Sequence, residues 1–313
     1  PLTPKTQVPS IDNDLLKGLK HPVADALVRA RKLSKYRSTF VDGIRKHSVR
    51  GRIHSTFNQL RIAKDEEGDE DGARFGRISC TDPNLQQQLS PSKDVEFGGL
   101  WRSIYLPEEG MLFFSNDFAA QEPRSIVHFA EACGCPRATE AADRYRQNPD
   151  TDPHTLTAQL IAGQGPEWVP SKQVRTQAKI IALGLAYGMG GAKLARSLGL
   201  PTKWEFVEKL NRTIEKAGPE AQALFDTFHA GVPYIRALAE LCQDAVRKRG
   251  YIRTIMGRRC QFPEKPLDQR RNKFDTHDWL HKSLNRLIQG SSADVTKLAT
   301  VQADEAGVFV QIQ

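Results

Sequence analysis

Residues 175–188 read Arg175-Thr-Gln-Ala-Lys179-Ile-Ile-Ala-Leu183-Gly-Leu-Ala-Tyr187-Gly188, and this stretch carries the strongest signal in the chain. On an α-helix it sets Arg, Lys, Leu and Tyr at successive i+4 positions, so the four side chains share one face. The two cations at one end of that face suit a polyphosphate, and the apolar and aromatic side chains at the other end suit a base. The stretch therefore predicts a nucleotide-binding helix, although Arg and Lys four residues apart also occur on many ordinary amphipathic helices.

The ends of this helix can also be predicted. Ser171 follows Pro170 and is a suitable N-cap, because its hydroxyl can accept a hydrogen bond from a free backbone N–H group of the first turn. The glycine-rich cluster 188–191 is suited to ending the helix, since glycine tolerates the left-handed conformation found at helix C-termini. We expect the helix over residues 171–188.

A second stretch, Met111-Leu-Phe-Phe-Ser-Asn-Asp117, is a short apolar run that ends abruptly on an acid. It continues as Phe118-Ala-Ala-Gln121-Glu122-Pro-Arg124. A short apolar run of this kind predicts a buried strand. A carboxylate at the end of such a strand is a suitable metal ligand, so Asp117 is a candidate for that role.

In this order, the two stretches resemble motifs A and B of the family A DNA polymerases, the group that includes bacterial DNA polymerase I and many phage replicases. Five further segments follow the family's order and extend the resemblance over almost the whole chain: residues 51–59, 76–86, 154–155, 250–259 and 285–294. The resemblance implies DNA-templated DNA synthesis, in which a primer 3′-hydroxyl attacks the α-phosphate of a nucleotide. The partners it implies are primer-template DNA and dNTPs.

The resemblance also implies an α+β fold of the right-hand polymerase type, with thumb, palm and fingers, an antiparallel palm sheet and largely helical fingers. On this chain a partial thumb would cover residues 1–50, the first part of the palm with motif A 51–124, the fingers 125–250, and the return to the palm 251–313. The motif B helix, residues 171–188, lies in the fingers. We expect a chain truncated at both ends, because it begins at Pro1 and ends before the family's motif C.

The same resemblance assigns chemistry to named residues. Nucleotidyl transfer builds negative charge on the attacking and the leaving oxygens, and two divalent ions about 3.5–4 Å apart stabilise both. Asp117 and the backbone carbonyl of Phe118 are the expected ligands of Mg²⁺, and Mn²⁺ would fit the same oxygens. Lys179 and Arg175 are expected to neutralise the triphosphate, Lys179 as a catalytic residue. His154 matches a phosphate-contacting His of the family, although a lone His is usually structural.

Three more residues are implied to contact the nucleotide. Glu122 matches the acid that would collide with a 2′-hydroxyl, so it favours deoxyribose. Gln121 beside it is expected to contact the incoming nucleotide. Tyr187 is expected to stack near the templating position.

The chain departs from the family pattern in two places within these motifs. Leu183 stands where the family usually has an aromatic residue, a substitution seen mainly in phage-type members. Because an aliphatic side chain offers no aromatic edge beside the sugar, we expect weak acceptance of dideoxynucleotides. Residues 119–121 and Pro123 also differ from the usual motif A, so the geometry around Asp117 is expected to differ slightly.

The remaining implied contacts are to DNA. Minor-groove acceptors are common to all base pairs, which suits Gln, Asn and Arg for a contact that ignores sequence. For Asn285 and Gln289 the alternative is helix capping or an ordinary exposed position. The expected DNA-binding residues are Lys35, Arg37, Ser38, Asn58, Arg77, Asn84, Gln86, Gly188, Arg258, Asn285 and Gln289.

Positive charge is concentrated towards the N-terminus. The chain has 45 Lys or Arg against 37 Asp or Glu, a net charge of +8. Residues 17–64 alone hold thirteen Lys or Arg and two acids, Asp25 and Asp42. This local excess predicts phosphate contacts and salt-sensitive binding, and a solvated basic helix face is the alternative. The acidic loop 65–72 is expected to be exposed, and we assign it no chemistry.

Periodicity predicts the other elements. One long basic helix is expected over residues 21–46 and a strand over 50–58. Residues 125–250 are mostly helical in pattern, with breaks that include 199–201 and 217–219. A hairpin over 251–262, a helix from about 277 to 306 and a final apolar run over 308–313 follow.

The five cysteines lack paired metal-ligand spacing, and no apolar run approaches the roughly 20 residues that a membrane helix needs. No signal peptide is visible either. We therefore expect no membrane partner and a reducing cytoplasm, that of a bacterial host if a phage encodes the chain. The sequence does not identify any replication accessory protein.

Two functions from different classes remain open. The first is a DNA-templated DNA polymerase represented by an incomplete sequence. The second is a module that binds primer-template and nucleotide without chemistry, because the His-Asp-Glu turn that carries the family's second catalytic carboxylate is absent. Asp117 and Glu122 favour the enzyme, since a binding module needs neither a metal ligand nor a sugar gate. An RNA-synthesising relative is disfavoured by Glu122 and by the segment 76–86.

Overall fold

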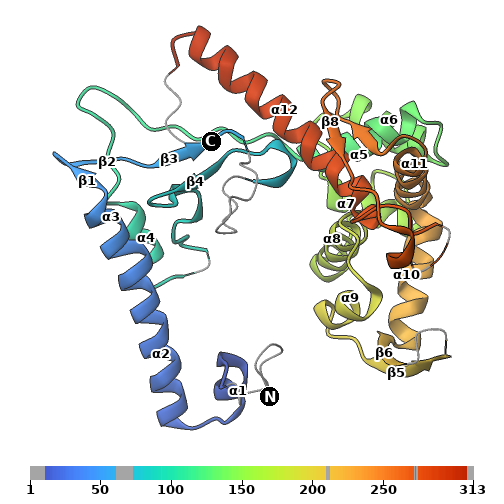
Figure 1. Cartoon of the computed structure of the whole chain (residues 1–313), viewed down its shortest axis with the longest axis horizontal. Coiled ribbons are helices and arrows are strands. Elements are labelled where there is room, and N and C mark those ends of the chain that lie inside the picture. The colour runs from blue at the N-terminus through green and yellow to red at the C-terminus, as the bar shows by residue number, and fades with distance from the viewer. Residues whose placement is uncertain are drawn as a thin grey trace. The chain divides into compact units, whose positions relative to one another are not determined.

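The structure is a computed structural model that describes residues 11–60, 73–92, 94–208, 212–270, 272 and 274–308. The chain forms two compact units (Figure 1). The first unit comprises Pro1–Ala73, Ile78–Phe113 and Val310–Gln313, and the second comprises Arg74–Arg77 and Phe114–Phe309. The short segment Arg74–Arg77 thus belongs to the second unit, although its neighbours on both sides in the chain belong to the first.

A long basic helix dominates the first unit. The unit begins with the short helix α1 (Asn13–Gly18). The long helix follows and consists of α2 (Pro22–Tyr36), a π-helical segment (Arg37–Asp42) and α3 (Gly43–Lys46). His21 is the N-cap of α2, and Pro22 stands in the first turn, where its missing N–H is not needed. The buried residue of α2 is Ala24. The predicted long basic helix is therefore confirmed, and most of its surface is exposed.

The rest of the first unit contains short strands and a buried acid. β1 (Ser48–Val49) pairs with β2 (Arg52–Ile53), and β3 (Thr56–Asn58) pairs with β4 (Ser79–Thr81), both antiparallel. A 3₁₀ turn (Leu85–Gln87) and α4 (Gly98–Arg102) follow. The buried Asp94 carboxylate lies 2.7 Å from the Lys32 amine and accepts a hydrogen bond from the Tyr36 hydroxyl. These two donors on α2 hold the pKa of Asp94 well below its usual range.

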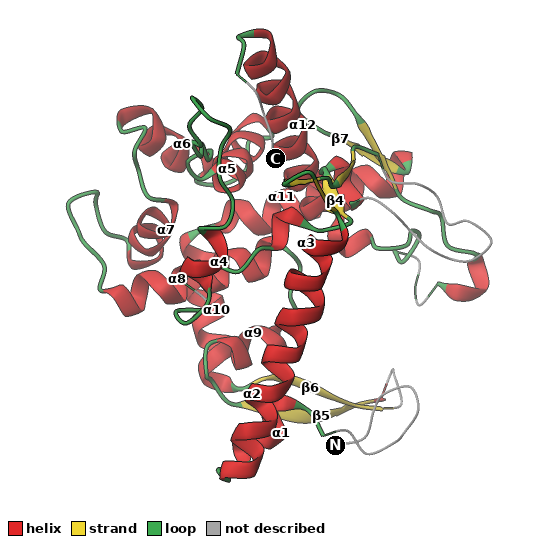
Figure 2. Cartoon of the chain, turned by 90° about the vertical axis from the view of Figure 1, so that its left-hand side faces the viewer, coloured by secondary structure: helices red, strands yellow, loops and turns green. Residues whose placement is uncertain are grey.

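Helices make up most of the second unit (Figure 2). A 3₁₀ turn at Arg74–Gly76 precedes α5 (Gln121–Ala132), α6 (Ala138–Gln147), α7 (Pro153–Ala162) and α8 (Lys172–Ala186). The helices that follow are α9 (Gly191–Ser197), α10 (Pro219–Gly231), α11 (Pro233–Arg249) and α12 (Ser283–Glu305), with 3₁₀ turns at Leu267–Gln269 and Leu280–Lys282. Two antiparallel hairpins lie between them: β5 (Thr202–Val207) with β6 (Arg212–Ala217), and β7 (Tyr251–Arg253) with β8 (Arg259–Gln261).

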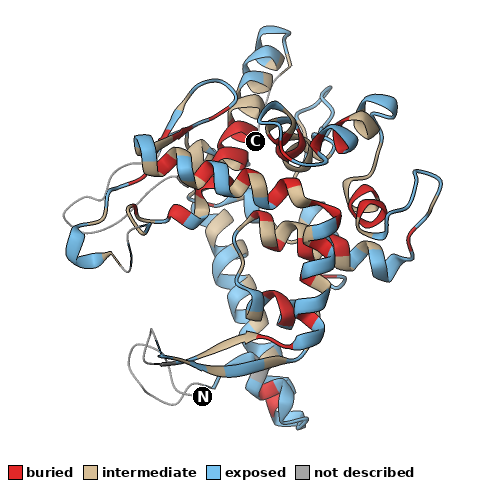
Figure 3. Ribbon diagram, turned by 90° about the vertical axis from the view of Figure 1, so that its right-hand side faces the viewer, coloured by how far each residue is buried: buried red, intermediate tan, exposed pale blue. Residues whose placement is uncertain are grey.

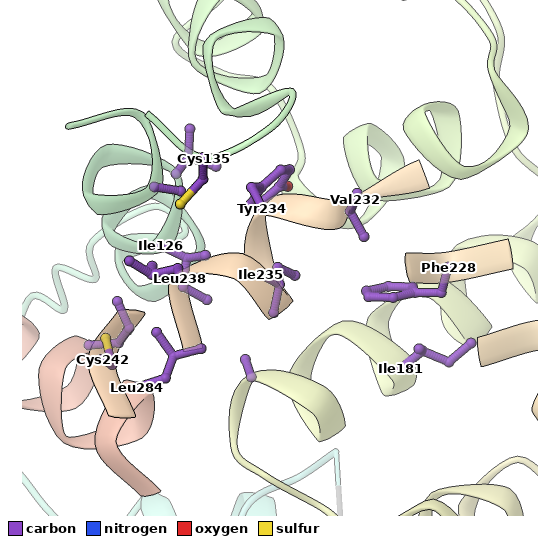
Figure 4. Packing of buried hydrophobic residues seen from close by; sticks show 14 of the residues in the cluster. Ile126, Cys135, Ile181, Phe228, Val232, Tyr234, Ile235, Leu238, Cys242 and Leu284 are labelled. Atoms are coloured by element: carbon purple, nitrogen blue, oxygen red, sulfur yellow. The ribbon is translucent and has the colours of Figure 1, made fainter. Parts of the chain in front are cut away.

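A hydrophobic core joins these helices. Phe228 of α10, Ile181 of α8 and Leu238 of α11 are each at most 1% exposed, and Figure 4 shows them among the packed side chains of one cluster. Figure 3 shows buried residues along several helices of the unit. Gly231 lies so close to α7 that an added Cβ would meet the Ile161 Cα atom at 2.5 Å. Glycine at this position therefore allows α7 and α10 to approach one another.

The fold is α+β with small antiparallel sheets, as the family resemblance implies. Among the described residues the strands form four separate two-stranded sheets. The predicted hairpin over 251–262 is β7–β8, and the predicted helix near 277–306 is α12, which begins later, at Ser283. The predicted strand over 50–58 is divided between β2 and β3. The loop 65–72 and residues 309–313 lie outside the described residues.

Two expectations are wrong. Residues 111–116 do not form a buried strand, since they are irregular and Leu112 and Phe114 are 88% and 66% exposed. An apolar run forms a strand only where a second strand pairs with its backbone groups, and within the described residues none does so here. Residues 202–217 lie in the region predicted to be mostly helical but form β5–β6. Trp204 and Phe206 alternate there with charged residues, and this period of two favours a strand.

All five cysteines are free thiols. Cys80, Cys135, Cys242 and Cys260 are buried, where a thiol packs like a small apolar side chain. In the parts of the chain that the structure describes, no helix is long and apolar enough to cross a membrane.

Candidate functional site

The ends of α8 are those that the sequence predicts. The Ser171 hydroxyl accepts a hydrogen bond from the Val174 N–H at 3.3 Å and so caps the first turn. At the other end, Gly188 adopts a φ of 69°, the left-handed conformation that glycine favours. The predicted helix over 171–188 is therefore confirmed.

One face of α8 carries the predicted nucleotide-binding residues. Arg175, Lys179 and Leu183 lie on successive turns, and Tyr187 is the C-cap residue. Ala178 and Ile181 are buried in the core on the other side of the helix. Lys179 is exposed, and Arg175, Leu183 and Tyr187 are partly exposed, so this face is accessible to a ligand.

An aspartate that the sequence analysis did not single out engages Arg175. The Arg175 Nε and Nη2 atoms donate to Asp152 Oδ2 and Oδ1, each at 2.8 Å. Asp152 also caps α7 by accepting a hydrogen bond from the Thr155 N–H at 2.8 Å. Burial acts to raise the pKa of Asp152, but the hydrogen bonds from Arg175 and Thr155 outweigh it and hold that pKa well below its usual range. The pair Asp152-Pro153 is an N-cap signature that could have identified this residue.

His154 lies close to these charges in the first turn of α7. Burial lowers the pKa of its imidazole below the usual 6.5; Asp152 acts against this shift, and the positive charges of Lys179 and Arg175 add to it. The ring is therefore neutral at pH 7 and can donate one hydrogen bond without adding charge. The structure thus brings together the three predicted phosphate-binding residues His154, Arg175 and Lys179.

Lys179 is the accessible cation of this cluster. Its side chain is exposed, and among the described residues its amine has no hydrogen-bond or ion-pair partner. Arg175, in contrast, already has both oxygens of Asp152 as acceptors. A ligand with two or more phosphates could therefore bind Lys179, which has no internal partner among the described residues, and would compete with Asp152 for Arg175.

The predicted sugar-gating acid also has an internal partner. Glu122 lies in the first turn of α5 and accepts a hydrogen bond from the guanidinium of Arg77, a residue predicted to contact DNA. Burial raises the pKa of Glu122 above its usual range, although the Arg77 charge acts to lower it. Next to Glu122, the Gln121 amide donates to the Ser292 carbonyl of α12 at 3.2 Å, which ties the start of α5 to α12.

The predicted metal ligands lie just before α5. Asp117 and Phe118 are both exposed. Within the described part of the chain, the Asp117 carboxylate has no hydrogen bond or ion pair. A carboxylate and a backbone carbonyl are hard oxygen donors, the kind that Mg²⁺ takes. The described residues contain no group of three or more His, Cys, Asp or Glu that could hold a metal ion, so Asp117 is not part of an acidic cluster there.

Arg258, predicted to bind DNA, makes its contacts inside the second unit. Its guanidinium donates to the Asp294 carboxylate at 2.7 Å and to the carbonyls of Phe75 and Gly290 at 2.9 and 3.0 Å. It also lies against Gly76, where an added Cβ would be 2.8 Å from the guanidinium carbon. Phe75 adopts a φ of 72°, a conformation that residues other than glycine rarely take. Arg258 therefore holds a strained segment of chain against α12.

Asn285 and Gln289 stand four residues apart on one face of α12, and both are partly exposed. Neither is the N-cap or the C-cap residue of α12, so the capping alternative is excluded for both. Asn285 Oδ1 is buried and accepts no hydrogen bond from the described residues. A buried amide oxygen without a donor destabilises a fold.

In the first unit, three predicted DNA-binding residues lie where α2 passes into the π-helical segment. The Ser38 hydroxyl donates to the Lys35 carbonyl at 3.3 Å. The Arg37 Nε atom lies 3.6 Å from the Asp42 carboxylate. The Lys35 side chain is exposed and has no partner among the described residues, so it is the accessible cation of the three.

The other three predicted DNA-binding residues of the first unit, Asn58, Asn84 and Gln86, lie around the β3–β4 pair. The Asn58 amide donates to the Thr81 hydroxyl at 3.4 Å. The Asn84 side chain accepts from the Gln86 N–H at 3.0 Å, and the Gln86 amide donates to the Ile78 carbonyl at 3.2 Å. Each side chain is therefore oriented by a neighbour in the first unit.

The chain is similar to known proteins of the family that its motifs resemble. The family model described as DNA polymerase family A matches residues 2–310. The chain belongs to DNA polymerase family A. This membership is shown by the match over nearly all of its length.

Individual family A relatives match the chain over most of its residues. A DNA-directed DNA polymerase of Pseudomonas phage M6 is 47% identical over 97% of this chain and 47% of its own length. DNA polymerase DpoZ of Salmonella phage PMBT28 is 33% identical over 92% of this chain and 44% of its own length. A solved structure, the POL domain of Pol1 from M. smegmatis in complex with DNA primer-template and dNTP, has a TM-score of 0.70 and 26% identity, covering 98% of this chain and 48% of that one. The chain thus spans about half the length of these relatives.

Proposed function

We propose that this family A chain works within a phage DNA polymerase that adds dNTPs to a primer 3′-hydroxyl under the direction of a DNA template. The observation that carries the proposal is the cluster of His154, Arg175 and Lys179 at the start of the α8 face. Two kinds of relative support it: the phage proteins, which are DNA polymerases by name, and the related solved structure, which is a complex with DNA primer-template and dNTP.

In this proposal the cluster binds the triphosphate. Lys179 contributes a full positive charge, because no described residue neutralises it. Arg175 is held in place by Asp152, and a phosphate would compete for the same guanidinium, since carboxylate and phosphate both fit its two parallel N–H groups. Neutral His154 donates its ring N–H to a phosphate oxygen. Leu183 and Tyr187, farther along the face, give the apolar and aromatic surface for sugar and base.

Glu122 serves as the sugar gate. Its carboxylate is largely buried in the first turn of α5, at 22% exposure, and Arg77 fixes its direction. A rigid acid at that place leaves no room for a 2′-hydroxyl. Glu122→Ala is therefore expected to raise the use of ribonucleotides over deoxyribonucleotides in a single-turnover assay, and an unchanged ratio would remove Glu122 from this role.

Asp117 and the Phe118 carbonyl fit a hard divalent cation in their donor chemistry, and the exposed Asp117 carboxylate has no competing partner among the described residues. We assign these two groups to Mg²⁺, with phosphate oxygens of the nucleotide as further ligands. When bound, Mg²⁺ stabilises the charge that develops on the attacking and leaving oxygens. Mn²⁺ would fit the same donors.

The remaining assignments concern DNA and the polymerase parts. We assign residues 1–50 to a thumb, 51–124 and 251–313 to a palm and 125–250 to fingers. Exposed Lys35 is assigned to the phosphate backbone, and Asn285 to the minor groove, where its amide N–H groups would donate to the base acceptors. Because its relatives include phage proteins, we assign the chain to the cytoplasm of a bacterial host.

Nucleotide binding tests the proposal without depending on turnover. The measurement uses the whole protein and a primer-template whose primer lacks a 3′-hydroxyl, so that the dNTP binds but does not react. Lys179→Ala is expected to weaken dNTP binding about 10- to 150-fold, because a charge-assisted contact is worth about 1.5–3 kcal/mol. Lys172→Ala, at the first residue of the same helix, is the matched control and should change it less than about twofold. Equal effects of the two changes would contradict the assignment of the α8 face.

A binding module without chemistry is the second candidate, because the described residues contain no acidic cluster that could hold a metal. Asp117→Ala separates the two. For the polymerase, primer extension by the whole protein is abolished while DNA binding is kept. If the unaltered whole protein binds primer-template and dNTP but never extends the primer, the module is the correct assignment.

A further inference from the structure

The β5–β6 hairpin carries two aromatic side chains that the site does not use. Its six paired positions include Trp204 opposite Glu215 and Phe206 opposite Thr213. Because successive side chains of a strand point to opposite faces, Trp204 and Phe206 share one face. They are 70% and 56% exposed. Figure 3 shows both strands mainly in the colours of exposed and partly exposed residues.

Neither ring belongs to the hydrophobic core of the second unit. Among the described residues, Trp204 and Phe206 stack on no other aromatic ring and on no cation. The hydrophobic core of the unit lies in its helices, and neither residue belongs to it. A contiguous apolar patch on the surface, rimmed by polar residues, is a feature of interaction sites. The face therefore lacks a partner within the described chain.

Charge around the hairpin favours an anionic partner. α9, β5 and β6 together contain five Lys or Arg against two acids, Glu205 and Glu215. Glu205 lies 2.7 Å from the Lys216 amine and 3.4 Å from that of Lys203. The charge of Glu205 is therefore engaged locally, while cations remain in excess.

Glu215, opposite Trp204, is engaged in the same way. It accepts a hydrogen bond from the Thr202 hydroxyl at 2.7 Å and forms an ion pair with Arg196 of α9. These two donors hold the pKa of Glu215 below its usual range. Its charge is balanced by Arg196, so it does not leave a free carboxylate to repel an anion from the aromatic face.

The spacing of the two rings fits the geometry of unpaired bases. Two strand residues that share a face are about 6.6–6.8 Å apart, which is about twice the 3.4 Å rise between neighbouring bases. One base can therefore lie between the rings, or two can stack on them in succession. Bases inside a duplex are already stacked on one another, so only a single strand can offer its base faces to such rings.

We propose that Trp204 and Phe206 form a stacking platform for single-stranded DNA, namely the unpaired part of the template. The choice of the template strand rests on the proposed polymerase function, whereas the stacking itself rests on the hairpin alone. The nearby cations contact the phosphates, and the rings contact the bases without regard to sequence. The hairpin adds a binding site for single strands outside the α8 face.

Binding of a fluorescent oligo(dT) of about 16 nucleotides, followed by anisotropy, tests this site. Trp204→Ala and Phe206→Ala are each expected to weaken oligo(dT) binding about 5- to 150-fold, the loss that removal of one stacked ring gives. Binding of a blunt duplex should change less than about twofold. Trp204→Phe keeps a ring and should retain most of the affinity, and Val169→Ala, an exposed apolar residue elsewhere in the unit, is the matched control.

Tryptophan fluorescence gives a direct second measurement. Oligo(dT) is expected to quench the emission of the unaltered protein, and Trp204→Phe should remove that quenching although Trp101, Trp168 and Trp279 remain. Quenching that persists in Trp204→Phe would overturn the proposal. So would unchanged oligo(dT) affinity in both alanine variants, or a concentration-dependent dimer that Trp204→Ala abolishes, which would assign the face to a second copy of the chain.

Failure of this inference can be told apart from failure of the polymerase assignment. If the alanine variants bind oligo(dT) like the unaltered protein while dNTP still binds on primer-template, only the hairpin proposal falls. If the unaltered protein binds oligo(dT) through the hairpin but never binds dNTP, the template assignment falls and the stacking site stands.

Discussion

α2 and α8 are helices of equal length, 15 residues each, and both carry basic side chains, yet they are held in different ways. The buried residue of α2 is Ala24, whereas α8 buries Ala178, Ile181, Gly184 and Ala186. A helix fixed by one buried face holds its charged side chains at defined positions, which suits a small ligand of defined shape. A mostly exposed basic helix presents its charges loosely, which suits the uniform phosphate backbone of DNA.

Substitutions in α2 and α8 should differ most in their effect on the stability of the protein. Ile181→Ala is expected to lower the free energy of unfolding by about 2–5 kcal/mol, because it leaves a cavity in the core of the second unit. Val23→Ala on α2, where the side chain is 68% exposed, should change it by less than about 0.5 kcal/mol. Chemical denaturation followed by circular dichroism measures both. Similar losses for the two variants would erase the distinction.

A smaller effect, on dNTP binding, is expected when Asp152, the partner of Arg175, is changed. Asp152→Asn keeps an N-cap for α7, since asparagine caps as well as aspartate, but removes a negative charge beside the predicted triphosphate site. We expect dNTP binding on primer-template to tighten about 3- to 10-fold, because Arg175 is no longer shared and repulsion is relieved. Weaker binding instead would show that the main role of Asp152 is to orient Arg175.

The pH dependence of stability sharpens the comparison further. Burial lowers the pKa of His154 in the folded protein, so its contribution to stability is present above the unfolded value of about 6.5 and is lost as pH falls below it. His154→Gln should reduce the loss of unfolding free energy that occurs as pH falls below about 6.5. Denaturant titrations over this range measure it. The exposed His128 of α5 provides the control, and an equal change in His128→Gln would contradict the assignment.

The smallest change is expected on the exposed basic helix. Lys35→Ala should weaken duplex binding less than about threefold at physiological salt and reduce the slope of log affinity against log salt by about one, irrespective of DNA sequence. Fluorescence anisotropy at several salt concentrations gives both values. A sequence-dependent loss, or an unchanged slope, would show that Lys35 does not contact phosphate.

Local signals account for what could be predicted. The bounds of α8 follow from Ser171 and Gly188, because caps involve only neighbouring residues. The hairpin β7–β8 and α12 likewise follow from local patterns, whereas the α+β class was predicted through the family resemblance. The cluster of His154, Arg175 and Lys179 was predicted through the family resemblance, since twenty residues lie between His154 and Arg175 in the sequence.

Non-local pairing explains what the sequence did not reveal. Residues 111–116 have the composition of a strand, but composition does not supply a partner for the backbone. Arg258 was assigned to DNA from its motif, and only the fold shows that its guanidinium reaches the carbonyls of Phe75 and Gly290. The pairing of Arg77 with Glu122 spans 45 residues and has no signature in either motif. The β5–β6 hairpin, in contrast, shows a period of two that was overlooked in a region dominated by helices.

The contact between Arg258 and Phe75 has a consequence for how the protein is made. The two residues are 183 positions apart, so the ribosome releases Phe75 long before the guanidinium that holds it exists. Until Arg258 and α12 have emerged, the Phe75 carbonyl lacks the guanidinium that it accepts from, although Arg77 in the same segment can already pair with Glu122. Contacts of such long range slow folding, because a large loop must close before they form. The second unit therefore reaches its final form only after α12 has emerged from the ribosome, and residues 114–308 expressed alone would lack the Phe75 carbonyl that Arg258 contacts.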